Sequence, residues 1–359
     1  MLPTLQELKA QFGQDKRVVF KEEIVGDETF TIVFYQIADN QFWEQSHATE
    51  VRGHVFDSSG KCVSAALEKF FNINEQKWTQ QNVLDFTDCV SYEKEDGSQI
   101  TSLVLNDKVY LKTKKTFYSD VAINANNNIK SNEIDLIKHL ADYGYTAIFE
   151  YTDPGWEIVV HYGSEPRFTL LAARNITTGK YLPREILESI AIIFDVIIVK
   201  EYKLTIEEML SEVDNITGRE GYVILLSDTT RVKLKFDWYI KNHSIKTKLR
   251  ERDVALMILE ETIDDIKASI VNVGYDLTEI LKLEYKINND IKKIREQVIN
   301  IINDHQYIEL KDLCLLYKDH KLFSLIINEY KLRNVDYNKY YKKNFLKNFS
   351  YKCLYNKNF

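Results

Sequence analysis

The pattern of apolar and polar positions predicts strands in the first part of the chain. Residues 17–35 are rich in β-branched and aromatic residues, with a turn signal at Gly26-Asp27, so we expect strands on both sides of that turn. Further strand-like segments are 51–56, 88–93, 99–105 and 108–114.

Helices are expected to interrupt these strands. Ser131 is a suitable N-cap for a helix that ends near Gly144, where a left-handed residue is favoured. Pro183 is expected to begin a second helix, and residues 204–213 a third.

From about residue 245 the pattern becomes helical. Apolar residues recur at steps of three or four, which predicts one long amphipathic helix. They are Leu283, Ile287, Ile291, Ile294, Val298 and Ile301. We therefore expect an α+β domain with antiparallel sheets at 1–243 and an all-helical domain at 244–359.

Composition adds few constraints. No run approaches the roughly 18 apolar residues that cross a bilayer, and the first residues lack the apolar core of a signal peptide. A cytoplasmic protein is the simplest expectation.

The four cysteines show no CxxC spacing and the seven histidines no HExxH cluster, so a metal here would be a hard ion held by carboxylates and phosphates. A net charge of −7 argues against general coating of nucleic acid but allows a local basic groove.

Lys94, in the segment KEDGS, is the first candidate for chemistry. Alternation turns it away from Glu93 and Glu95 at the end of a strand, and Gly97 permits a sharp turn. A lysine nucleophile must lose its proton, which a free lysine with a pKa of about 10.4 rarely does. The hypothesis therefore predicts that other cations converge on Lys94. A solvated turn lysine is the alternative.

Lys233 and Lys235 lie two apart in a strand-like segment, so both side chains share one face. Two adjacent like charges favour an anion between them, such as a triphosphate. An edge strand protected from aggregation by lysines is the alternative. Lys112 and Lys114 have the same spacing, but they are a less specific indication of an anion site.

Four other residues have suitable chemistry. Arg52 and Lys69 are candidates for phosphate binding, and Gly53 would allow close approach of a backbone. Glu150 and Glu220 lie within apolar, strand-like stretches, where a carboxylate is costly unless it is paired or binds a metal or a sugar hydroxyl. An ordinary buried ion pair is the alternative for each glutamate.

The order of these segments resembles the motif series of covalent nucleotidyltransferases, which comprise DNA ligases, RNA ligases and mRNA capping enzymes. The series is RG at Arg52, KEDGS at Lys94, FE at Glu150, EGYV at Glu220 and KLK at Lys233. It is most similar to the RNA ligase 1 family, the tRNA-repair ligases of large bacteriophages. The likeness covers most of residues 17–250 and continues weakly into the helical region. It implies that the first domain, 1–243, performs adenylyl transfer and that the helical domain, 244–359, sets the specificity for RNA.

This resemblance implies a role for each matching residue. Lys94 would form lysyl-AMP, and the triphosphate of ATP would contact Tyr35, Arg52, Lys69, Lys233 and Lys235. Glu150 would hold the ribose or a metal-bound water, and Glu220 matches the other essential acid. Asp264 resembles an acidic residue implicated in binding Mg²⁺, for which Mn²⁺ is an alternative.

The implied reaction is ATP-dependent joining of RNA ends through lysyl-AMP and RNA-adenylate. The expected substrate is single-stranded or nicked-loop RNA such as tRNA, in a host cytoplasm if the protein is viral. A polynucleotide kinase–phosphatase is the expected functional partner. The alternatives are a capping guanylyltransferase or DNA ligase, which would normally carry a β-barrel after the catalytic domain, and an inactive RNA-binding protein.

The last segment, 331–359, combines eight Lys and Arg with one Asp and many aromatic residues. Such a composition suits the backbone and bases of RNA. The alternative is a final helix with a solvated lysine face and an aromatic core face.

Overall fold

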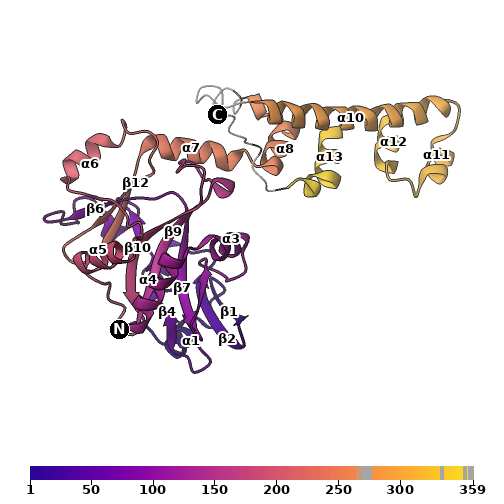
Figure 1. Cartoon of the computed structure of the whole chain (residues 1–359). Helices are drawn as coiled ribbons and strands as arrows, with labels where there is room; N and C mark the ends of the chain where they lie inside the picture. Colours follow the sequence, from indigo (N-terminus) through magenta and orange to yellow (C-terminus); the bar gives the residue numbers. More distant parts are fainter. Residues whose placement is uncertain (265–266, 268–276, 332–334, 351–353, 355–359) are drawn as a thin grey trace. The chain divides into compact units, whose positions relative to one another are not determined.

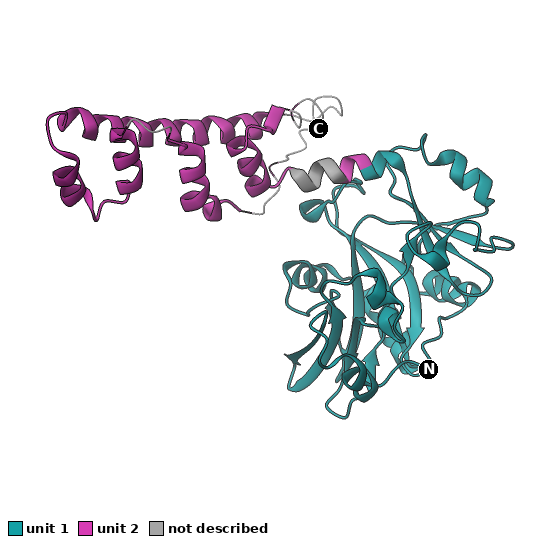
Figure 2. Cartoon of the chain, turned by 180° about the vertical axis from the view of Figure 1, so that it is seen from behind, with its two compact units in different colours: residues 1–240 teal, residues 241–359 magenta. Residues whose placement is uncertain are grey.

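The computed structural model describes residues 1–264, 267, 277–331, 335–350 and 354, and only the backbone at 244–248. It divides into two compact units, residues 1–240 and 241–359 (Figure 2). The sequence placed a boundary between residues 243 and 244. The assignment of adenylyl transfer to the first part and RNA specificity to the second stays a prediction.

A four-stranded antiparallel sheet, sheet A, begins the first unit (Figure 1). Its order is β1 (Val18–Val25), β2 (Glu28–Tyr35), β3 (Arg52–Phe56) and β4 (Cys62–Ser64), after helix α1 (Leu5–Phe12). The short helix α2 (Asn40–Trp43) follows β2. Apolar residues of α1 pack on one face of the sheet. The pairing of β1 with β2 closes at Val25 and Glu28, which confirms the turn predicted at Gly26-Asp27.

Sheet C is antiparallel with the order β10-β9-β7-β8. Its strands are β7 (Ser98–Leu105), β8 (Lys108–Lys112), β9 (Tyr145–Thr152) and β10 (Arg167–Asn175). Helices α3 (Asp120–Asn128), α4 (Ser131–Asp142) and α5 (Arg184–Ile193) contribute to the core on one of its faces. Ile148 and Glu150 alternate with that core along β9 and so belong to the other face.

Sheet B has the order β11-β6-β12-β13-β5. Its strands are β5 (Phe71–Asn72), β6 (Val90–Glu93), β11 (Glu201–Tyr202), β12 (Gly221–Leu225) and β13 (Arg231–Lys235). Only the short β5–β13 contact is parallel among the described strands. Helix α6 (Ile206–Glu212) packs with Val232 and Leu234 on one face, which leaves Lys233 and Lys235 on the other, as the alternation predicts.

Most of the predicted elements in this unit are confirmed, but the cap of α4 is wrong. The N-cap is Lys130, and Ser131 is already the first helical residue. The backbone N–H of Lys130 donates to Glu133 Oε2 at 2.6 Å, so a glutamate inside the helix satisfies its start. Gly144 follows the helix at φ +76°, as expected.

All regular elements that the structure describes after residue 240 are helices. The helices of the second unit are α8 (Glu251–Leu259), α10 (Thr278–Asp304), α11 (Leu310–Tyr317), α12 (Phe323–Tyr330) and α13 (Tyr337–Phe345), while α7 (Asp237–Lys248) spans the boundary. Short 3-10 turns occur in both units: Ala48–Glu50, Lys77–Thr79 and Pro154–Trp156 in the first, and Leu346–Asn348 in the second. The 27-residue α10 confirms the long predicted helix.

Two apolar clusters form along α10, one with α8 and α13 and one with α11 and α12. Tyr341 and Phe349, from the basic and aromatic end of the chain, are buried in the first cluster. These two aromatic side chains therefore belong to a core rather than to an exposed stacking surface. None of the described helices is both long and apolar enough to span a membrane.

Candidate active site

Lys94 lies where the chain passes from sheet B to sheet C. Its N–H donates to the carbonyl of Gly221 at 2.9 Å, which fixes the residue just beyond β6. Three residues later Gly97 packs so tightly that an added Cβ would lie 2.4 Å from the carbonyl oxygen of Tyr151. The glycine therefore permits a close crossing between the sheets, and β7 begins at the next residue.

Asp96 anchors this crossing. Its buried carboxylate accepts hydrogen bonds from the N–H groups of Val159 and Val160 at 2.7 and 2.8 Å. It also accepts one from the hydroxyl of Tyr239 at 2.7 Å. Because all three donors are protein groups from distant segments, Asp96 acts as an internal support for the Lys94 segment.

Glu220 connects Lys94 to the second lysine pair. Its Oε1 lies 2.7 Å from Lys94 Nζ and 2.8 Å from Lys235 Nζ. Glu220 is 2% exposed, so this carboxylate is removed from water and compensated by two ammonium groups. The next residue, Gly221, has φ +151°, and a Cβ there would lie 2.0 Å from the carbonyl of Leu234. Only glycine therefore fits at position 221, where the chain passes from Glu220 into its pairing with β13.

More cations gather near this contact, which is the arrangement that a nucleophilic Lys94 requires. Burial, together with repulsion from Lys69, Lys94 and Arg52, lowers the pKa of Lys233 to about 7. Burial lowers the pKa of Lys69 too, with repulsion from Arg52 and Lys235. The cluster thus lacks enough negative charge of its own, and it favours a multivalent anion.

Aromatic rings support the cations. Lys233 Nζ lies 5.3 Å from the ring centre of Phe70, and the guanidinium of Arg52 lies 5.8 Å from the same ring. Lys69 Nζ lies 4.7 Å from the ring of Phe71. Cation–π contacts hold these side chains without neutralising them. Their charges therefore remain available to a ligand.

Tyr35 joins the cluster through Lys114. Lys114 Nζ lies 3.8 Å from the Tyr35 ring centre, and burial together with Lys115, Arg52 and Lys69 lowers its pKa to about 8. Lys112 has a different environment although it shares the spacing. It is fully buried, and its Nζ donates to the carbonyl of Thr113 at 3.0 Å.

Gly53 allows a close backbone approach, as expected, but the approaching backbone belongs to the protein. An added Cβ would lie 2.6 Å from the carbonyl oxygen of Lys114. The glycine therefore lets the chain that carries Lys114 pass beside Arg52. Its contribution to the cation cluster is structural.

Glu150, on β9, faces the same region from sheet C. Burial raises the pKa of its carboxyl to about 8, with Glu220 adding to the rise and Lys94 and Arg52 opposing it. Its Oε1 accepts a hydrogen bond from the Gly97 N–H at 3.1 Å. A carboxyl group with such a pKa changes protonation close to neutral pH, which is typical of functional sites.

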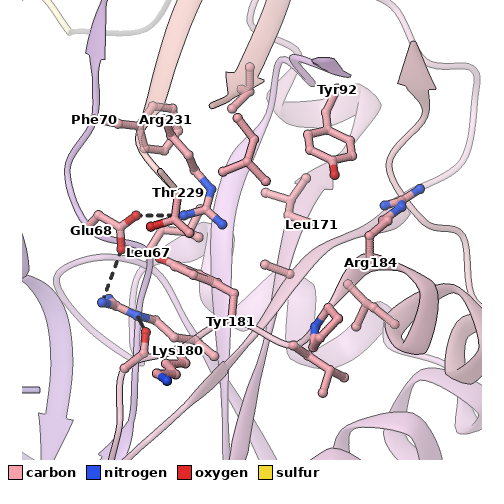
Figure 3. A pocket seen from close by; sticks show the side chains of 18 of the residues that line it. Leu67, Glu68, Phe70, Tyr92, Leu171, Lys180, Tyr181, Arg184, Thr229 and Arg231 are labelled. Carbon is pink, nitrogen blue, oxygen red and sulfur yellow. Dashed lines mark hydrogen bonds and ion pairs between the residues drawn. The ribbon is translucent and has the colours of Figure 1, made fainter. Parts of the chain in front are cut away.

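A cavity of about 770 Å³ adjoins the cation cluster (Figure 3). Tyr92 and Val223 of sheet B line it, and Val223 pairs with Lys233. From the other side come Leu67, Leu171 and Ala172, which make much of the lining apolar. The cavity thus has a largely apolar lining, and it meets the group of cations at Phe70, whose ring lies near Lys233 and Arg52.

Charged side chains form two edges of this cavity. On one edge Glu68 pairs with Arg231 at 2.8 Å and with Arg174 at 3.2 Å. On the other, the guanidinium of Arg184 lies 5.2 Å from the ring centre of Tyr92. Figure 3 shows Arg231 and Glu68 on one side of Leu171, with Tyr92 and Arg184 on the other. Polar groups at such edges are suited to orienting a planar ligand.

The structure brings together eight of the nine residues selected from the sequence. They are Tyr35, Arg52, Lys69, Lys94, Glu150, Glu220, Lys233 and Lys235. Asp264 belongs to the second unit, where its largely exposed side chain pairs with Lys267 at 3.2 Å. Among the described residues, no group of three or more His, Cys, Asp or Glu is arranged to hold a metal ion.

Sequence reasoning did not select Phe70, Phe71 or Arg231. Arg231 shares the face of Lys233 and Lys235, so its position two residues earlier in the strand was an available signal. The two phenylalanines follow Lys69 directly, but no periodicity indicates that their rings lie under cations.

Comparison with known proteins specifies the class to which this fold belongs. A family model described as RNA ligase matches residues 50–251. The chain belongs to this RNA ligase family, which confirms the enzyme class expected from the motif series.

Individual relatives are more distant. A protein of Thermovibrio ammonificans, provisionally named an RNA ligase, is 28% identical over 270 residues, which are 70% of each chain. A solved structure of Aquifex aeolicus, provisionally named an ATP-dependent DNA ligase, has a TM-score of 0.50 and 14% identity over 88% of this chain and 89% of that one. That likeness concerns the fold alone. An RNA ligase of Naegleria gruberi with ATP and Mn matches 44% of this chain and 51% of its own, at 18% identity and a TM-score of 0.37.

Proposed function

We propose that the protein is an ATP-dependent RNA ligase in which Lys94 carries AMP. One observation supports this assignment above the others. A lysine at a rigid crossing between two sheets shares a buried carboxylate with a second lysine, and further cations lie near it. The geometry provides an amine and a place for a triphosphate, and the cavity lined by Phe70, whose ring is 5.3 Å from Lys233 Nζ, provides a place for a base.

The nucleobase of ATP fits the apolar slot between Val223 and Leu171. The register of sheet B then directs its triphosphate toward Lys233, since this residue pairs with Val223 and lies beside Phe70 at the cavity wall. Arg52, Lys69 and Lys235 would neutralise the remaining phosphate charge. Tyr35 would contact the phosphates next to Lys114.

In the first step Lys94 Nζ attacks the α-phosphate of ATP. A nitrogen–phosphorus bond forms, the bond to the bridging oxygen breaks, and pyrophosphate leaves. The amine must lose a proton, and Glu220 Oε1 is an acceptor that already lies 2.7 Å from it. The neighbouring cations favour this step because they stabilise the charge that develops on the phosphate oxygens and on pyrophosphate.

In the second step the 5′-phosphate of RNA attacks lysyl-AMP, and the amine leaves after regaining a proton. The product is RNA whose 5′ end carries AMP through a pyrophosphate bond. In the third step a 3′-hydroxyl attacks the RNA phosphate of that bond and AMP departs. Each step is a phosphoryl transfer, so one group of fixed cations serves all three.

A divalent ion, Mg²⁺ or Mn²⁺, fits the site as a companion of the nucleotide. Such ions are typically held by one or two carboxylates plus phosphates, and Glu150 is a carboxyl group that forms no ion pair within the described part of the chain. When bound, the ion would withdraw electron density from the phosphate oxygens. Glu150 would hold it through water, or hold the ribose. Asp264, in the second unit, stays a separate prediction as a ligand of Mg²⁺.

The RNA is, in this proposal, a broken single strand such as a tRNA loop, with ends prepared by a kinase–phosphatase. The first unit, residues 1–240, would perform adenylyl transfer, and the helical second unit would select the RNA. Two features favour this over capping or DNA joining. The family is that of RNA ligases, and no strand follows Lys235 in the described residues, where a β-barrel would be expected.

The test uses ATP and GTP labelled at the α-phosphate, followed by denaturing electrophoresis and ligation assays. We expect transfer of label to the protein from ATP, and joining of 5′-phosphorylated single-stranded RNA. Labelling from GTP alone would indicate a capping enzyme. Joining of nicked DNA without joining of RNA would indicate a DNA ligase. An absence of both labelling and joining would support an inactive RNA-binding protein.

A further inference from the structure

The residues directly before Lys94 and Glu220 are also paired with each other. Arg219 Nε donates to both carboxylate oxygens of Glu93, at 2.9 and 3.0 Å, and its Nη2 lies 2.8 Å from Glu93 Oε2. The two dipeptides Glu93-Lys94 and Arg219-Glu220 are therefore joined by two consecutive ion pairs. The Glu93-Lys94 dipeptide supplies the acidic residue of the Glu93–Arg219 pair and the basic residue of the Lys94–Glu220 pair.

The Arg219–Glu93 pair lies on the side of sheet B away from the cation cluster. The guanidinium of Arg219 is 4.6 Å from the ring centre of Tyr202 and 5.0 Å from that of Tyr222. The ring of Phe236 is 5.4 Å away, and Tyr202 also donates its hydroxyl hydrogen to Glu93. The side chains of Arg219 and Glu93 are 25% and 11% exposed. Three aromatic rings thus hold an ion pair, in which Nε of Arg219 is hydrogen-bonded to both carboxylate oxygens, in a partly dehydrated position.

Glu220 needs a support of this kind. It lies between two glycines with positive φ, Gly218 at +76° and Gly221 at +151°, so the local backbone is intrinsically permissive. Its side chain is nevertheless held in a buried contact with two lysines. Arg219 provides a fixed point directly next to it, and Glu93 provides the corresponding point next to Lys94.

The second effect of the pair is electrostatic. Without Arg219, the carboxylate of Glu93 would lie uncompensated next to Lys94 in the sequence. In the native protein, the charged groups that face Lys94 are Glu220, Glu150 and Lys233, and Lys235 lies on the other side of Glu220. An added negative charge would favour the ammonium form of the nucleophile and oppose attack.

We propose that Arg219 and Glu93 are positioning residues for adenylyl transfer, which fix Lys94 and Glu220 from the reverse side of the sheet. This inference rests on the proposed function, since it concerns the step in which Lys94 acts. The third step joins RNA ends without a bond to Lys94, so it should depend much less on the pair. This difference separates positioning from a general effect on folding.

The experiment compares Arg219→Gln and Arg219→Lys with the wild-type chain. One readout is the single-turnover rate of labelling by ATP. The other is the joining of a single-stranded RNA that already carries a 5′-adenylate. Arg17→Gln is the matched control, because Arg17 also pairs with carboxylates and packs on a ring, Phe42, but lies directly before strand β1 of sheet A.

For Arg219→Gln we expect labelling to slow by about tenfold or more, since small misplacements of reacting groups are costly. The loss should appear mainly in the maximal rate rather than in KM for ATP. Joining of the pre-adenylated RNA should change by less than about threefold. Arg219→Lys, which keeps the charge but loses the fork, should lie between, and Arg17→Gln should match wild type in both reactions.

Equal losses in labelling and in pre-adenylated joining would overturn the positioning role, and so would wild-type labelling in Arg219→Gln. If Arg219→Gln does not fold by circular dichroism, Arg219→Lys decides, and wild-type labelling there would overturn the inference too. A wild-type protein that takes up no label would instead overturn the proposed function. The two failures are therefore distinguishable.

Discussion

Lys94 Nζ lies 2.7 Å from Glu220 Oε1, and the glutamate side chain is 3% exposed. An amine and a buried carboxylate in direct contact usually form a purely structural pair. Here the same oxygen also contacts Lys235 at 2.8 Å, so one negative charge serves two positive ones. The contact leaves net positive charge at the site, and we expect the position of the Lys94 amine to depend on the charge of Glu220.

Glu220→Gln tests this relationship. The amide keeps the shape of the side chain but removes the charge that holds two lysines together, and it is a poor proton acceptor. We expect the rate of labelling by ATP to fall by roughly 100-fold or more, comparable to the loss of one preorganised electrostatic group. Single-turnover labelling measures the effect.

Glu95→Gln is the matched control for this change. Glu95 lies next to Lys94 in the sequence, but its carboxylate pairs with Arg167. We expect a loss of labelling several-fold smaller than that of Glu220→Gln. Equal losses in the two variants would mean that removing any carboxylate near the crossing has the same effect, and would contradict a specific role for the Glu220 contact.

Lys233→Met separates function from stability. Burial and three neighbouring cations lower the pKa of Lys233 to about 7, so its native environment opposes a positive charge. Removing that charge should raise the free energy of unfolding near neutral pH by ~1 kcal/mol, given about 1.4 kcal/mol per pKa unit and allowance for solvent screening. Labelling by ATP should fall by roughly 100-fold, because a phosphate partner is lost.

Urea unfolding without nucleotide measures the stability change of Lys233→Met. Lys108→Met, at an exposed position on β8, is the control and should change neither property appreciably. A destabilised Lys233→Met variant would contradict the view that the cluster is strained without a ligand.

The sequence predicted the positions of the helices and strands better than it predicted which strands pair in one sheet. Alternation correctly placed Lys233 and Lys235 on one face, because Val232 and Leu234 must reach the apolar core. It did not show that β6 and β7, only four residues apart, belong to different sheets. Strand patterns encode which face is buried, whereas the choice of partner strand depends on contacts far apart in the chain.

The site follows the same division. Motif order indicated that Lys94 and the later lysines belong together, and the structure brings Lys94 and Lys235 to one carboxylate, with Lys233 close enough to be repelled by Lys94. The two-residue spacing of Lys112 and Lys114 did not show that their environments differ. Lys112 is buried, whereas Lys114 lies beside the Tyr35 ring. The aromatic supports and the Arg219–Glu93 pair depend on tertiary contacts that no local period records.

Glu150→Gln should change the pH dependence of stability. The pKa of the Glu150 carboxyl is raised from 4.5 to about 8 in the native protein. Between these pH values the native state binds more protons than the unfolded chain, so this group's contribution to the free energy of unfolding falls as pH rises. Glutamine removes that contribution.

The stability of Glu150→Gln relative to wild type should therefore increase by ~1–3 kcal/mol between pH 5 and about 8.5. Denaturant unfolding at several pH values, without nucleotide or metal, measures the difference. Subtraction of the two curves cancels other titrating groups. A difference that stays constant with pH, or decreases, would contradict the raised pKa.

The most direct test is the location of the AMP. Protein incubated with labelled ATP and a divalent ion would be digested, and the modified peptide sequenced by mass spectrometry. Lys94→Ala, with its fold checked by circular dichroism, is the control variant. We predict AMP on Lys94 and no label in the variant. AMP on Lys233 or Lys235, or full labelling of Lys94→Ala, would contradict the account.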